Sequence, residues 1–310
     1  MSRVVITEFM DDAAVERLSQ TAPTLYQPDL VDRRDDLLAS LAETEVLVVR
    51  NRTRVNEALL QVAPRLQAVG RLGVGLDNID LEACRARNLH VWPATGANDL
   101  AVAEYVITTA MMLLRGAYAH AQDVASGLWP RQKLIGRELS GHTMGLLGFG
   151  AIARQVGTRA RALGMRVIAH DPHLNPADPA WVDAQRVSFQ DLMAQSDVLS
   201  LHVPLTDQTR HVIGKDALAA MKPGSVVVNA ARGGVVDEAA LAAALRTGHV
   251  AGAALDVFEV EPLTAEAGAA FRDIPNLILT PHIAGVTEES NVRVSNLIAD
   301  KVLAHLAERG

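Results

Sequence analysis

Short runs of apolar, mostly β-branched residues alternate with helical patterns along the first third of the chain. We expect strands at 4–6, 46–49 and 66–69, because these runs are short, apolar and bounded by polar residues. The helical patterns that follow them cover residues 11–18, 55–62 and 79–87. This alternation is typical of a parallel sheet with helical crossover connections.

The alternation is interrupted at residues 93–98, where Pro93 and Gly96 favour a turn. We place a domain boundary there, and Asn98 is expected to cap a long helix that runs through Leu114. Beyond that helix the alternation resumes. The expected strands are 144–147, 166–170, 198–202, 225–229, 251–257 and 277–280. Their nearly continuous apolar character predicts a doubly wound sheet with both faces buried. Thr287 then marks the start of a final helix.

Composition narrows the class of protein. The chain has 310 residues, of which 49% are hydrophobic and 21% charged, so we expect a folded protein of about two domains. A net charge of −7 argues against nucleic acid as the main partner. The single cysteine, Cys84, excludes an internal disulfide and a cysteine-rich metal site, so no metal is expected.

The beginning of the chain does not have the pattern of a signal peptide, because no charged segment precedes a long apolar run. The longest apolar stretch, residues 106–114, is much shorter than the roughly 20 residues that a membrane span requires. We therefore expect a cytoplasmic protein that does not contact a membrane.

The segment from Met144 to Ala153 has the pattern of a strand followed by G-x-G-x-x-A at the start of a helix. Gly148 permits a tight turn, Gly150 lets a pyrophosphate approach the backbone, and Ala153 allows the helix to pack closely on the strand. The following helix offers N–H groups and the positive end of its dipole. The residues expected to bind a dinucleotide here are Gly148, Phe149, Gly150, Ala151 and Ile152. A packing turn without a ligand is the alternative.

Asp171 lies 23 residues after Gly148, at the end of the next expected strand. An acid at this place accepts hydrogen bonds from the adenosine ribose and repels a 2′-phosphate, which predicts NAD rather than NADP as the cofactor. The alternative is an aspartate that caps a helix.

Three further residues, Arg232, Glu261 and His282, each follow an expected strand of the same sheet. Ligands of doubly wound folds bind at the carboxyl ends of the strands, so we expect these residues to act together. Arg232 can hold a carboxylate bidentately, and His282 can exchange a hydroxyl proton near neutral pH. Glu261 would orient the imidazole ring and stabilise its protonated form. Individually, the three could also be a surface turn, a surface acid and a structural histidine.

Taken in order, these motifs resemble the D-isomer-specific 2-hydroxyacid dehydrogenase family, in particular its phosphoglycerate dehydrogenase-like branch. Residues 71–80 and 101–105 add to the resemblance, which covers essentially the whole chain. It implies an NAD-dependent oxidoreductase that transfers a hydride between the nicotinamide and C2 of a D-2-hydroxy acid or 2-keto acid. Arg232 would then bind the substrate carboxylate, with His282 as the acid and base and Glu261 as its partner.

The resemblance also implies an α/β fold with two domains. Residues 98–286 would form the Rossmann-type NAD domain, and residues 1–97 with 287–310 would form a smaller, flavodoxin-like substrate domain. A homodimer is implied, with Trp129 against the partner subunit, although core burial of Trp129 is an alternative.

The family pattern assigns further residues to the two ligands. Asp256 and the backbone at Ala230 would contact the nicotinamide end of the cofactor. The other residues expected to bind the cofactor are Ala231, Arg232, His282 and Gly285. Val203 and Pro204 would border the adenine, and backbone N–H groups near Gly73, Val74 and Gly75 would hold the substrate. His202, just before Val203, is expected to line the adenine site as well, and a structural histidine at the strand end is the alternative.

Four arginines, at positions 50, 52, 54 and 71, are concentrated on two strand ends of this acidic chain. Arg50 and Arg71 resemble the residues that bind the phosphate in the phosphoglycerate branch, so a substrate with a 3-phospho or 3-sulfo group is expected. Asn51 would also lie against the substrate, but it replaces the serine more usual there. The alternative is that these arginines, Arg52 and Arg54 above all, simply face solvent.

Two other functions remain open at this point. An NAD(P)H-dependent glyoxylate or hydroxypyruvate reductase would use the same chemistry in the opposite direction, although Asp171 argues against NADPH. A non-catalytic, dinucleotide-sensing corepressor would keep the fold and the triad without turnover.

Overall fold

The structure, a computed structural model, describes residues 3–308, which form two compact units. One unit comprises residues 99–285, and the other comprises residues 3–98 together with 286–308. Asn98 and Val286 belong to the discontinuous unit, so each division lies one residue from the boundary expected from the sequence. Below, the discontinuous unit is unit 1 and the continuous one is unit 2.

Unit 1 contains a sheet of five parallel strands in the order β2-β1-β3-β4-β5. The strands are β1 (Val4–Ile6), β2 (Thr24–Tyr26), β3 (Val46–Val49), β4 (Ala68–Arg71) and β5 (His90–Pro93). The predictions for β1, β3 and β4 are confirmed, whereas β2 and β5 were not expected. This is the flavodoxin-like order, in which the direction of winding reverses between β1 and β3.

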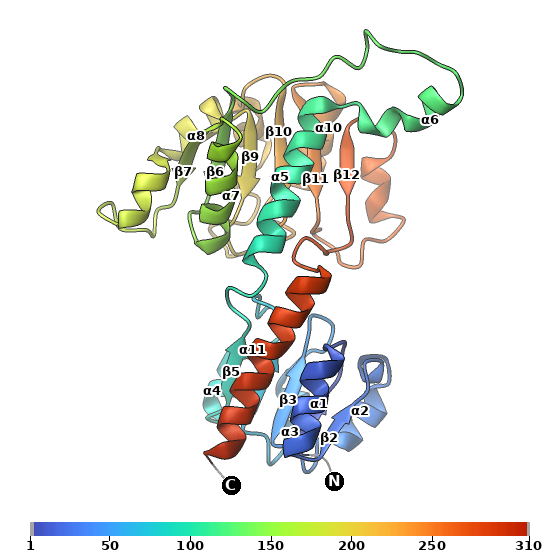
Figure 1. Cartoon of the computed structure of the whole chain (residues 1–310), viewed down its shortest axis with the longest axis vertical. Coiled ribbons are helices and arrows are strands. Elements are labelled where there is room, and N and C mark those ends of the chain that lie inside the picture. Colours follow the sequence, from blue (N-terminus) through green and yellow to red (C-terminus); the bar gives the residue numbers. More distant parts are fainter. Residues whose placement is uncertain (1–2, 309–310) are drawn as a thin grey trace. The chain divides into compact units, whose positions relative to one another are not determined.

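Helices cover both faces of the unit 1 sheet. They are α1 (Asp12–Thr21), α2 (Arg34–Ser40), α3 (Glu57–Gln61), α4 (Leu81–Ala86), α11 (Glu288–Ala307) and the 3₁₀ turn η1 (Leu30–Asp32). Val4 and Ile6 of β1 pack with α1 and α11 on one face, while Val5 packs with α2, α3 and α4 on the other. Figure 1 shows α1 and α11 side by side. The predicted start of α11 is confirmed, because Thr287 and Ser290 form a reciprocal capping box.

Unit 2 contains seven parallel strands in the order β12-β11-β10-β9-β6-β7-β8. They are β6 (Thr143–Leu147), β7 (Arg166–His170), β8 (Gln185–Arg186), β9 (Val198–Leu201), β10 (Ser225–Asn229), β11 (Val250–Leu255) and β12 (Leu277–Leu279). Six of these strands were expected, and the exposed two-residue β8 was not. The order is that of a Rossmann fold with an added strand, and winding reverses between β6 and β9.

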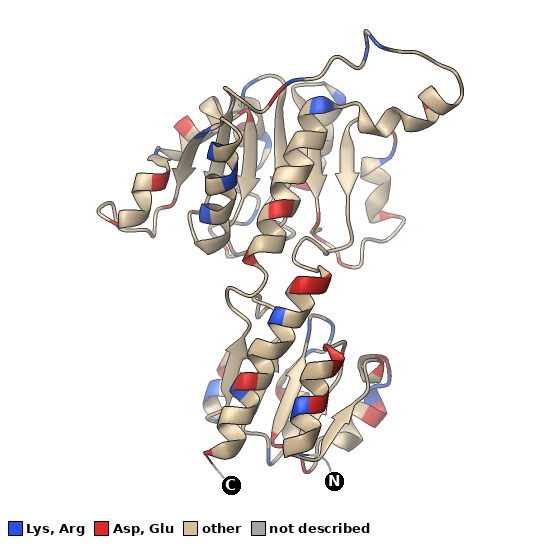
Figure 2. Ribbon diagram, viewed as in Figure 1, with Lys and Arg blue, Asp and Glu red and all other residues tan. Residues whose placement is uncertain are grey.

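The helices of unit 2 also form two layers. They are α5 (Asp99–Arg115), α6 (Ala121–Ala125), α7 (Ala151–Ala162), α8 (Phe189–Gln195), α9 (Lys215–Ala220) and α10 (Glu238–Arg246), with 3₁₀ turns η2 (Tyr118–His120), η3 (Pro179–Asp183) and η4 (Ala267–Phe271). α5 and α7 cover one face, and α8, α9 and α10 cover the other (Figure 1). Acidic and basic residues are interspersed along the helices and loops, and the strands carry few of them (Figure 2).

The residue before α5 differs from its prediction. The side-chain oxygen of Asn98 is buried but accepts no hydrogen bond from the described part of the chain, so the expected cap by Asn98 is wrong.

Within residues 3–308, no single helix is long and apolar enough to cross a membrane. α5 and the Tyr118–Ala125 segment meet that test only as a pair, which is bent by 67°.

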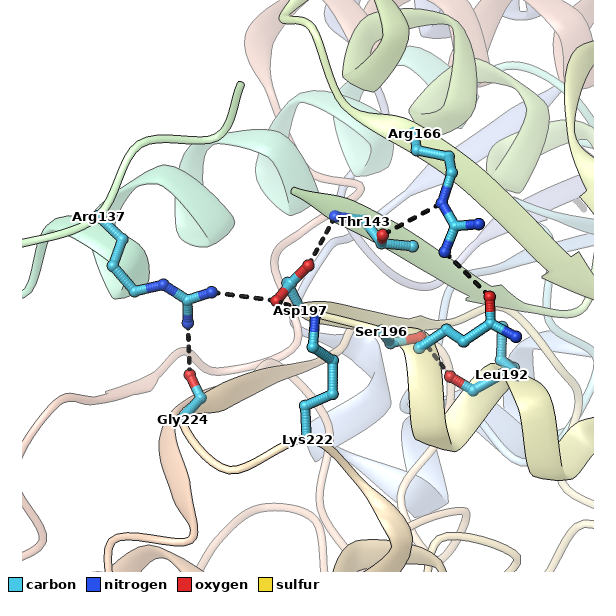
Figure 3. Close-up of polar contacts among 9 residues, drawn as sticks. Arg137, Thr143, Arg166, Leu192, Ser196, Asp197, Lys222 and Gly224 are labelled. Atoms are coloured by element: carbon cyan, nitrogen blue, oxygen red, sulfur yellow. Dashed lines mark hydrogen bonds and ion pairs between the residues drawn. The ribbon is translucent and has the colours of Figure 1, made fainter. Parts of the chain in front are cut away.

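An ionic cluster around the buried carboxylate of Asp197 lies at the amino-terminal edge of the seven-stranded sheet (Figure 3). Asp197, just before β9, accepts hydrogen bonds from Lys222 Nζ at 2.7 Å, Arg137 Nη2 at 3.0 Å and Thr143 N at 2.8 Å. Burial alone would raise the pKa of Asp197, but Lys222 and the Thr143 N–H outweigh it and lower the pKa below its usual range. Because Arg137 also donates to Gly224 O, this carboxylate joins the segment before β6 to the start of β10.

Candidate active site

The glycine-rich turn after β6 lies where the winding of the unit 2 sheet reverses. Gly148 has a φ of +84°, and a Cβ added to it would lie 2.5 Å from His202 O. Only glycine fits this position without strain. Gly150 is the N-cap of α7, and a Cβ added there would meet no atom within 4 Å. The turn therefore leaves open space at the helix N-terminus, which is the arrangement that a dinucleotide pyrophosphate requires.

Asp171 lies beside this turn, as the motif predicts. Its carboxylate accepts the N–H of Phe149 at 2.9 Å, of His173 at 2.9 Å and of Leu174 at 3.1 Å. Burial would raise the pKa of Asp171, but these three donors lower it below its usual value. The carboxylate is thus held ionised beside Phe149, in the position from which a fixed negative charge disfavours a 2′-phosphate. No helix begins or ends at Asp171, so the alternative of a helix cap does not describe it.

The segment after β9 borders the same turn. A Cβ on Gly148 would lie 3.0 Å from Val203 Cγ1, so this side chain packs against the glycine turn. His202 Nε2 lies 2.9 Å from Ser200 Oγ, and burial lowers the pKa of His202 to about 4. At neutral pH His202 is therefore uncharged and suits an apolar wall beside an adenine ring rather than an acid–base role.

Arg232 lies in the loop after β10, between residues that fix the loop backbone. Asn229 Nδ2 donates to Arg232 O at 2.9 Å, and Ala231 N donates to Asn229 Oδ1 at 3.1 Å. A Cβ added to Gly233 would lie 1.7 Å from Phe258 O, so this loop and the loop after β11 are in direct backbone contact. That contact brings the charge of Arg232 close enough to Glu261 to lower the pKa of the glutamate.

Glu261 and His282 form a hydrogen-bonded pair, with 2.7 Å between Oε2 and Nδ1. The other carboxylate oxygen accepts the Phe258 N–H at 3.0 Å. Burial alone would raise the pKa of Glu261, but the bonds from His282 and Phe258 and the charge of Arg232 lower it. Since Nδ1 is bound to the carboxylate, Nε2 is the nitrogen of His282 that can exchange a proton with a substrate.

The backbone of His282 is held in a left-handed conformation, with a φ of +58°. Its N–H donates to Asp256 O, while the buried Asp256 carboxylate accepts the N–H groups of Ile283 and Ala284, both at 2.8 Å. Asp256 was expected to contact the nicotinamide. In the structure, the carboxylate of Asp256 fixes the turn that carries His282.

Tyr105 and Thr280 also support the turn that carries His282, and this role was not identified from the sequence. Tyr105 Oη lies 2.7 Å from Thr280 Oγ1, which donates to Asp256 Oδ1 at 2.6 Å. Burial raises the pKa of Tyr105 to about 12, so this phenol stays protonated. The motif at residues 101–105 contained the signal, since Tyr105 is the one polar aromatic residue on the buried face of α5.

Arg50 and Arg71, the arginines expected to bind a second anion, lie in unit 1 at the carboxyl ends of neighbouring strands. Both are half-buried, whereas Arg52 and Arg54 are exposed. Arg50 Nη2 donates to Asn291 Oδ1 at 2.8 Å, and Arg52 forms an ion pair with Asp32. The structure therefore separates the four arginines into two inward and two solvent-facing members.

The backbone near Arg71 is shaped by that side chain. Gly73 has a φ of +150°, and a Cβ added to it would lie 1.5 Å from Arg71 Nη1. Gly73 thus provides room for the guanidinium group, and Val74 and Gly75 follow it in the same loop. Asn51, in the loop after β3, is exposed. The roles of Gly73, Val74, Gly75 and Asn51 in binding a substrate stay predictions from the sequence.

No group of three or more His, Cys, Asp or Glu side chains in the described chain could hold a metal ion. The turn between β6 and α7, by contrast, fits a dinucleotide on two counts. Gly148 cannot carry a side chain, and the space beyond Gly150 is open. An ionised acid lies beside this turn, as a ribose requires.

Comparison with known proteins identifies the family to which this fold and motif order correspond. Residues 107–284 match the model of the D-isomer specific 2-hydroxyacid dehydrogenase, NAD binding domain. The chain is 53% identical to the (S)-sulfolactate dehydrogenase of Chromohalobacter salexigens over all 310 residues, with both chains covered completely. It is 40% identical to the D-3-phosphoglycerate dehydrogenase of Archaeoglobus fulgidus over 87% of this chain, but it spans only 51% of that protein.

A solved structure gives the same result for the fold. The D-lactate dehydrogenase of Aquifex aeolicus, complexed with NAD and lactic acid, superposes with a TM-score of 0.88 at 28% identity. The match covers 98% of this chain and 96% of that one. The expected α/β architecture, with a Rossmann-type and a flavodoxin-like sheet, is confirmed.

Proposed function

Because this chain belongs to the D-isomer-specific 2-hydroxyacid dehydrogenase family, we propose that it interconverts a 3-sulfo-2-hydroxy acid and its 2-keto acid. The chain is an NAD-dependent oxidoreductase. Sulfolactate and sulfopyruvate are the simplest pair of such acids. The observation that carries this choice is the similarity to the sulfolactate dehydrogenase, which extends over the full length of both chains.

The S descriptor of sulfolactate is compatible with a family named for D isomers. In lactate the carboxyl group outranks the methyl group, and the D isomer receives the descriptor R. In sulfolactate the sulfur atom makes the C3 substituent outrank the carboxyl group. The descriptor therefore changes to S while the spatial arrangement at C2 stays the same.

In the proposed mechanism, Arg232 holds the substrate carboxylate with its planar guanidinium group. His282 removes the hydroxyl proton from the alcohol through Nε2, or returns it to the ketone in the reverse direction. Glu261 stays ionised throughout and stabilises the imidazolium that forms. Bound NAD supplies the hydride acceptor for C2, and NADH supplies the hydride donor.

We assign the second anionic group of the substrate to Arg50 and Arg71. Burial lowers the pKa of Arg50, so its charge is partly desolvated and interacts strongly with an anion. Its guanidinium lies over the Phe9 ring, 5.8 Å from the centroid, which limits its rotation.

The proposed function is tested by following NADH oxidation with a panel of 2-keto acids. The panel contains sulfopyruvate, phosphohydroxypyruvate, hydroxypyruvate, glyoxylate and pyruvate, and each is also measured with NADPH. We expect the highest kcat/KM with sulfopyruvate and NADH. A preference for glyoxylate or hydroxypyruvate would replace the proposed function with that of a reductase for singly charged acids.

We also assign the chain to a homodimer, on the basis of the segment that follows α5. Its apolar side chains are largely exposed in the single chain: Tyr118, Val124, Leu128, Trp129 and Ile135. Trp129 is 80% exposed, so the alternative of core burial does not describe this residue. Several large apolar side chains exposed within one segment favour a protein interface there.

Sedimentation velocity tests the dimer. We expect a mass twice the 33.1 kDa of one chain, and a shift toward the monomer in Trp129→Glu. A wild-type protein that sediments as a monomer at micromolar concentration would contradict this assignment.

A further inference from the structure

Glu8 is a buried acidic residue of unit 1 that the mechanism above does not use. It follows β1 and is only 4% exposed. Its Oε1 accepts the N–H of Arg50 and of Thr53, both at 2.9 Å, and its Oε2 accepts the N–H of Arg52 at 3.1 Å. One carboxylate therefore organises the whole loop that begins with Arg50.

The opposite side of the same loop is held by a neutral residue. Asn78 Nδ2 donates to Arg50 O at 3.1 Å and to Thr53 O at 2.6 Å. Thr53 Oγ1 also lies 2.8 Å from Thr7 Oγ1, next to Glu8 in the chain. Backbone N–H groups and carbonyl groups of this loop both form hydrogen bonds, so the backbone that carries Arg50 is fixed.

The charge of Glu8 is not cancelled by contact with a cation. It forms no ion pair within residues 3–308, because its three partners are backbone N–H groups. It nevertheless interacts electrostatically with the guanidinium group of Arg50 and favours its charged form. Glu8 therefore adds a fixed negative charge beside the positive charge of Arg50.

The position of Glu8 in the fold makes this charge relevant to a ligand. Glu8 follows β1 and Arg50 follows β3, the two strands between which the winding of the unit 1 sheet reverses. In open α/β sheets, ligands bind outside the carboxyl ends of the strands at this reversal. A charge fixed there acts on whatever anion Arg50 holds.

We propose that Glu8 determines which second anion the site prefers, selecting a singly charged sulfonate over a doubly charged phosphate. A sulfonate carries one negative charge at any pH in the working range, whereas a phosphate monoester carries about −1.5 to −2 at pH 7. The additional charge of the phosphate is repelled by the Glu8 carboxylate. This inference rests on the proposed function, in which Arg50 and Arg71 bind the second anionic group.

Glu8→Gln is the direct test, because glutamine is nearly isosteric and uncharged. Its amide oxygen can still accept the N–H groups of Arg50 and Thr53, while the bond from Arg52 is lost. The values of kcat/KM for sulfopyruvate and phosphohydroxypyruvate are measured with saturating NADH on one preparation. We expect their ratio to shift toward phosphohydroxypyruvate by about five-fold. A loop that is merely displaced would lower both values and leave the ratio unchanged.

Two matched variants separate local charge from other effects. Glu8→Asp keeps the charge, so the substrate ratio should stay within about two-fold of the wild-type ratio even if both activities fall. Glu45→Gln removes one carboxylate at the opposite end of the same sheet, where Glu45 pairs with Arg3, and should also preserve the ratio. A shift in either control equal to that of Glu8→Gln would overturn the proposal.

A measurement on the unaltered protein gives a test that does not depend on folding of a variant. Lowering the pH from 7.5 to 5.5 protonates the phosphate, whose second pKa is about 6, but leaves the sulfonate unchanged. We expect the ratio of kcat/KM values to move toward phosphohydroxypyruvate at the lower pH, because the phosphate then loses the additional charge that Glu8 repels. The ratio is the relevant quantity, since titration of enzyme groups affects both substrates.

The possible failures are distinguishable. A ratio that moves the other way on acidification, or that is unaffected by Glu8→Gln while sulfopyruvate remains the best substrate, overturns the role of Glu8 alone. If the wild-type protein uses neither doubly anionic acid, the proposed function itself is wrong.

Discussion

The Glu261 carboxylate lies 2.7 Å from His282 Nδ1, and its other oxygen accepts the backbone N–H of Phe258. The glutamate is therefore fixed by its own loop before it contacts the histidine. Because the pKa of Glu261 is lowered, its carboxylate is charged at neutral pH. Such a pair orients the ring and stabilises its protonated form as the alcohol becomes a ketone.

The first prediction concerns His282. Replacing it with glutamine removes the group that exchanges the hydroxyl proton, so we expect kcat to fall by about 10³-fold while the Kd for NADH changes little. Steady-state kinetics and NADH fluorescence titration measure the two effects. His211 provides a matched control, since its ring is similarly exposed and lies 3.1 Å from Glu259. If His211→Gln loses as much activity as His282→Gln, the assignment of the proton to His282 is wrong.

The second prediction separates two glycines of the same turn. Gly150→Ala adds a methyl group to open space at a φ of −76°, so the free energy of unfolding should fall by less than about 1 kcal/mol, the cost of alanine at an N-cap. The methyl group would occupy the volume proposed for the pyrophosphate, and we expect the Kd for NADH to rise at least about ten-fold. Gly148→Ala forces a Cβ against His202 O and should destabilise the protein by about 1–3 kcal/mol. Calorimetric titration and urea unfolding distinguish the two variants, and equal effects on binding and stability in both would refute the assignment.

The third prediction concerns cofactor choice. The ionised Asp171 is expected to disfavour the 2′-phosphate of NADPH by about 100-fold in kcat/KM, because like charges at a contact cost several kcal/mol. Asp171→Ser removes the charge and should reduce the preference for NADH to less than about ten-fold. The ratio of NADH to NADPH activity is the relevant quantity, since loss of the bond to Phe149 N weakens both cofactors. A wild-type protein that uses NADPH as well as NADH would contradict this role of Asp171.

Most of the architecture was predictable because apolar periodicity reports burial, and parallel strands are buried on both faces. The runs of Val and Leu at β3, β9 and β10 are fully buried, and their strands were found. β2, β5 and β8 were missed because their residues are only partly buried or exposed. Thr24, Gln185 and His90 carry no apolar signal that distinguishes an edge strand from a loop.

The proximity of Arg232, Glu261 and His282 was also predictable, because each residue follows a strand whose end was recognisable. Their supports were not. Asp256, Thr280 and Tyr105 come from three separate segments, and only the fold brings their side chains together. Glu8 escaped notice for the same reason, because its partners lie 42 to 45 residues further along the chain.

The fourth prediction uses the Asp197 cluster to test stability. A carboxyl group with a lowered pKa stabilises the folded state above its unfolded pKa of about 3.9, and that contribution is lost as the pH falls through the folded pKa. Asp197→Asn should therefore lower the stability at pH 7 by about 2–4 kcal/mol and flatten the loss of stability below about pH 4. Asp207→Asn, at an exposed aspartate without a side-chain hydrogen bond in the described chain, is the control. Urea unfolding between pH 3 and 7 provides the comparison, and identical profiles for the two variants would refute the role of the cluster.

The central claim, that the chain uses a 2-keto acid with a second anionic group held by Arg50, is tested most directly by one kinetic comparison. The kcat/KM values for sulfopyruvate and pyruvate are measured in the wild type, in Arg50→Met and in Arg52→Met. Arg52 is the matched control, because it lies in the same loop but pairs with Asp32 at the surface. We predict that Arg50→Met lowers the value for sulfopyruvate by about 100-fold and that for pyruvate by less than about three-fold, while Arg52→Met changes neither. Equal effects of the two variants, or a wild-type preference for pyruvate, would contradict the account.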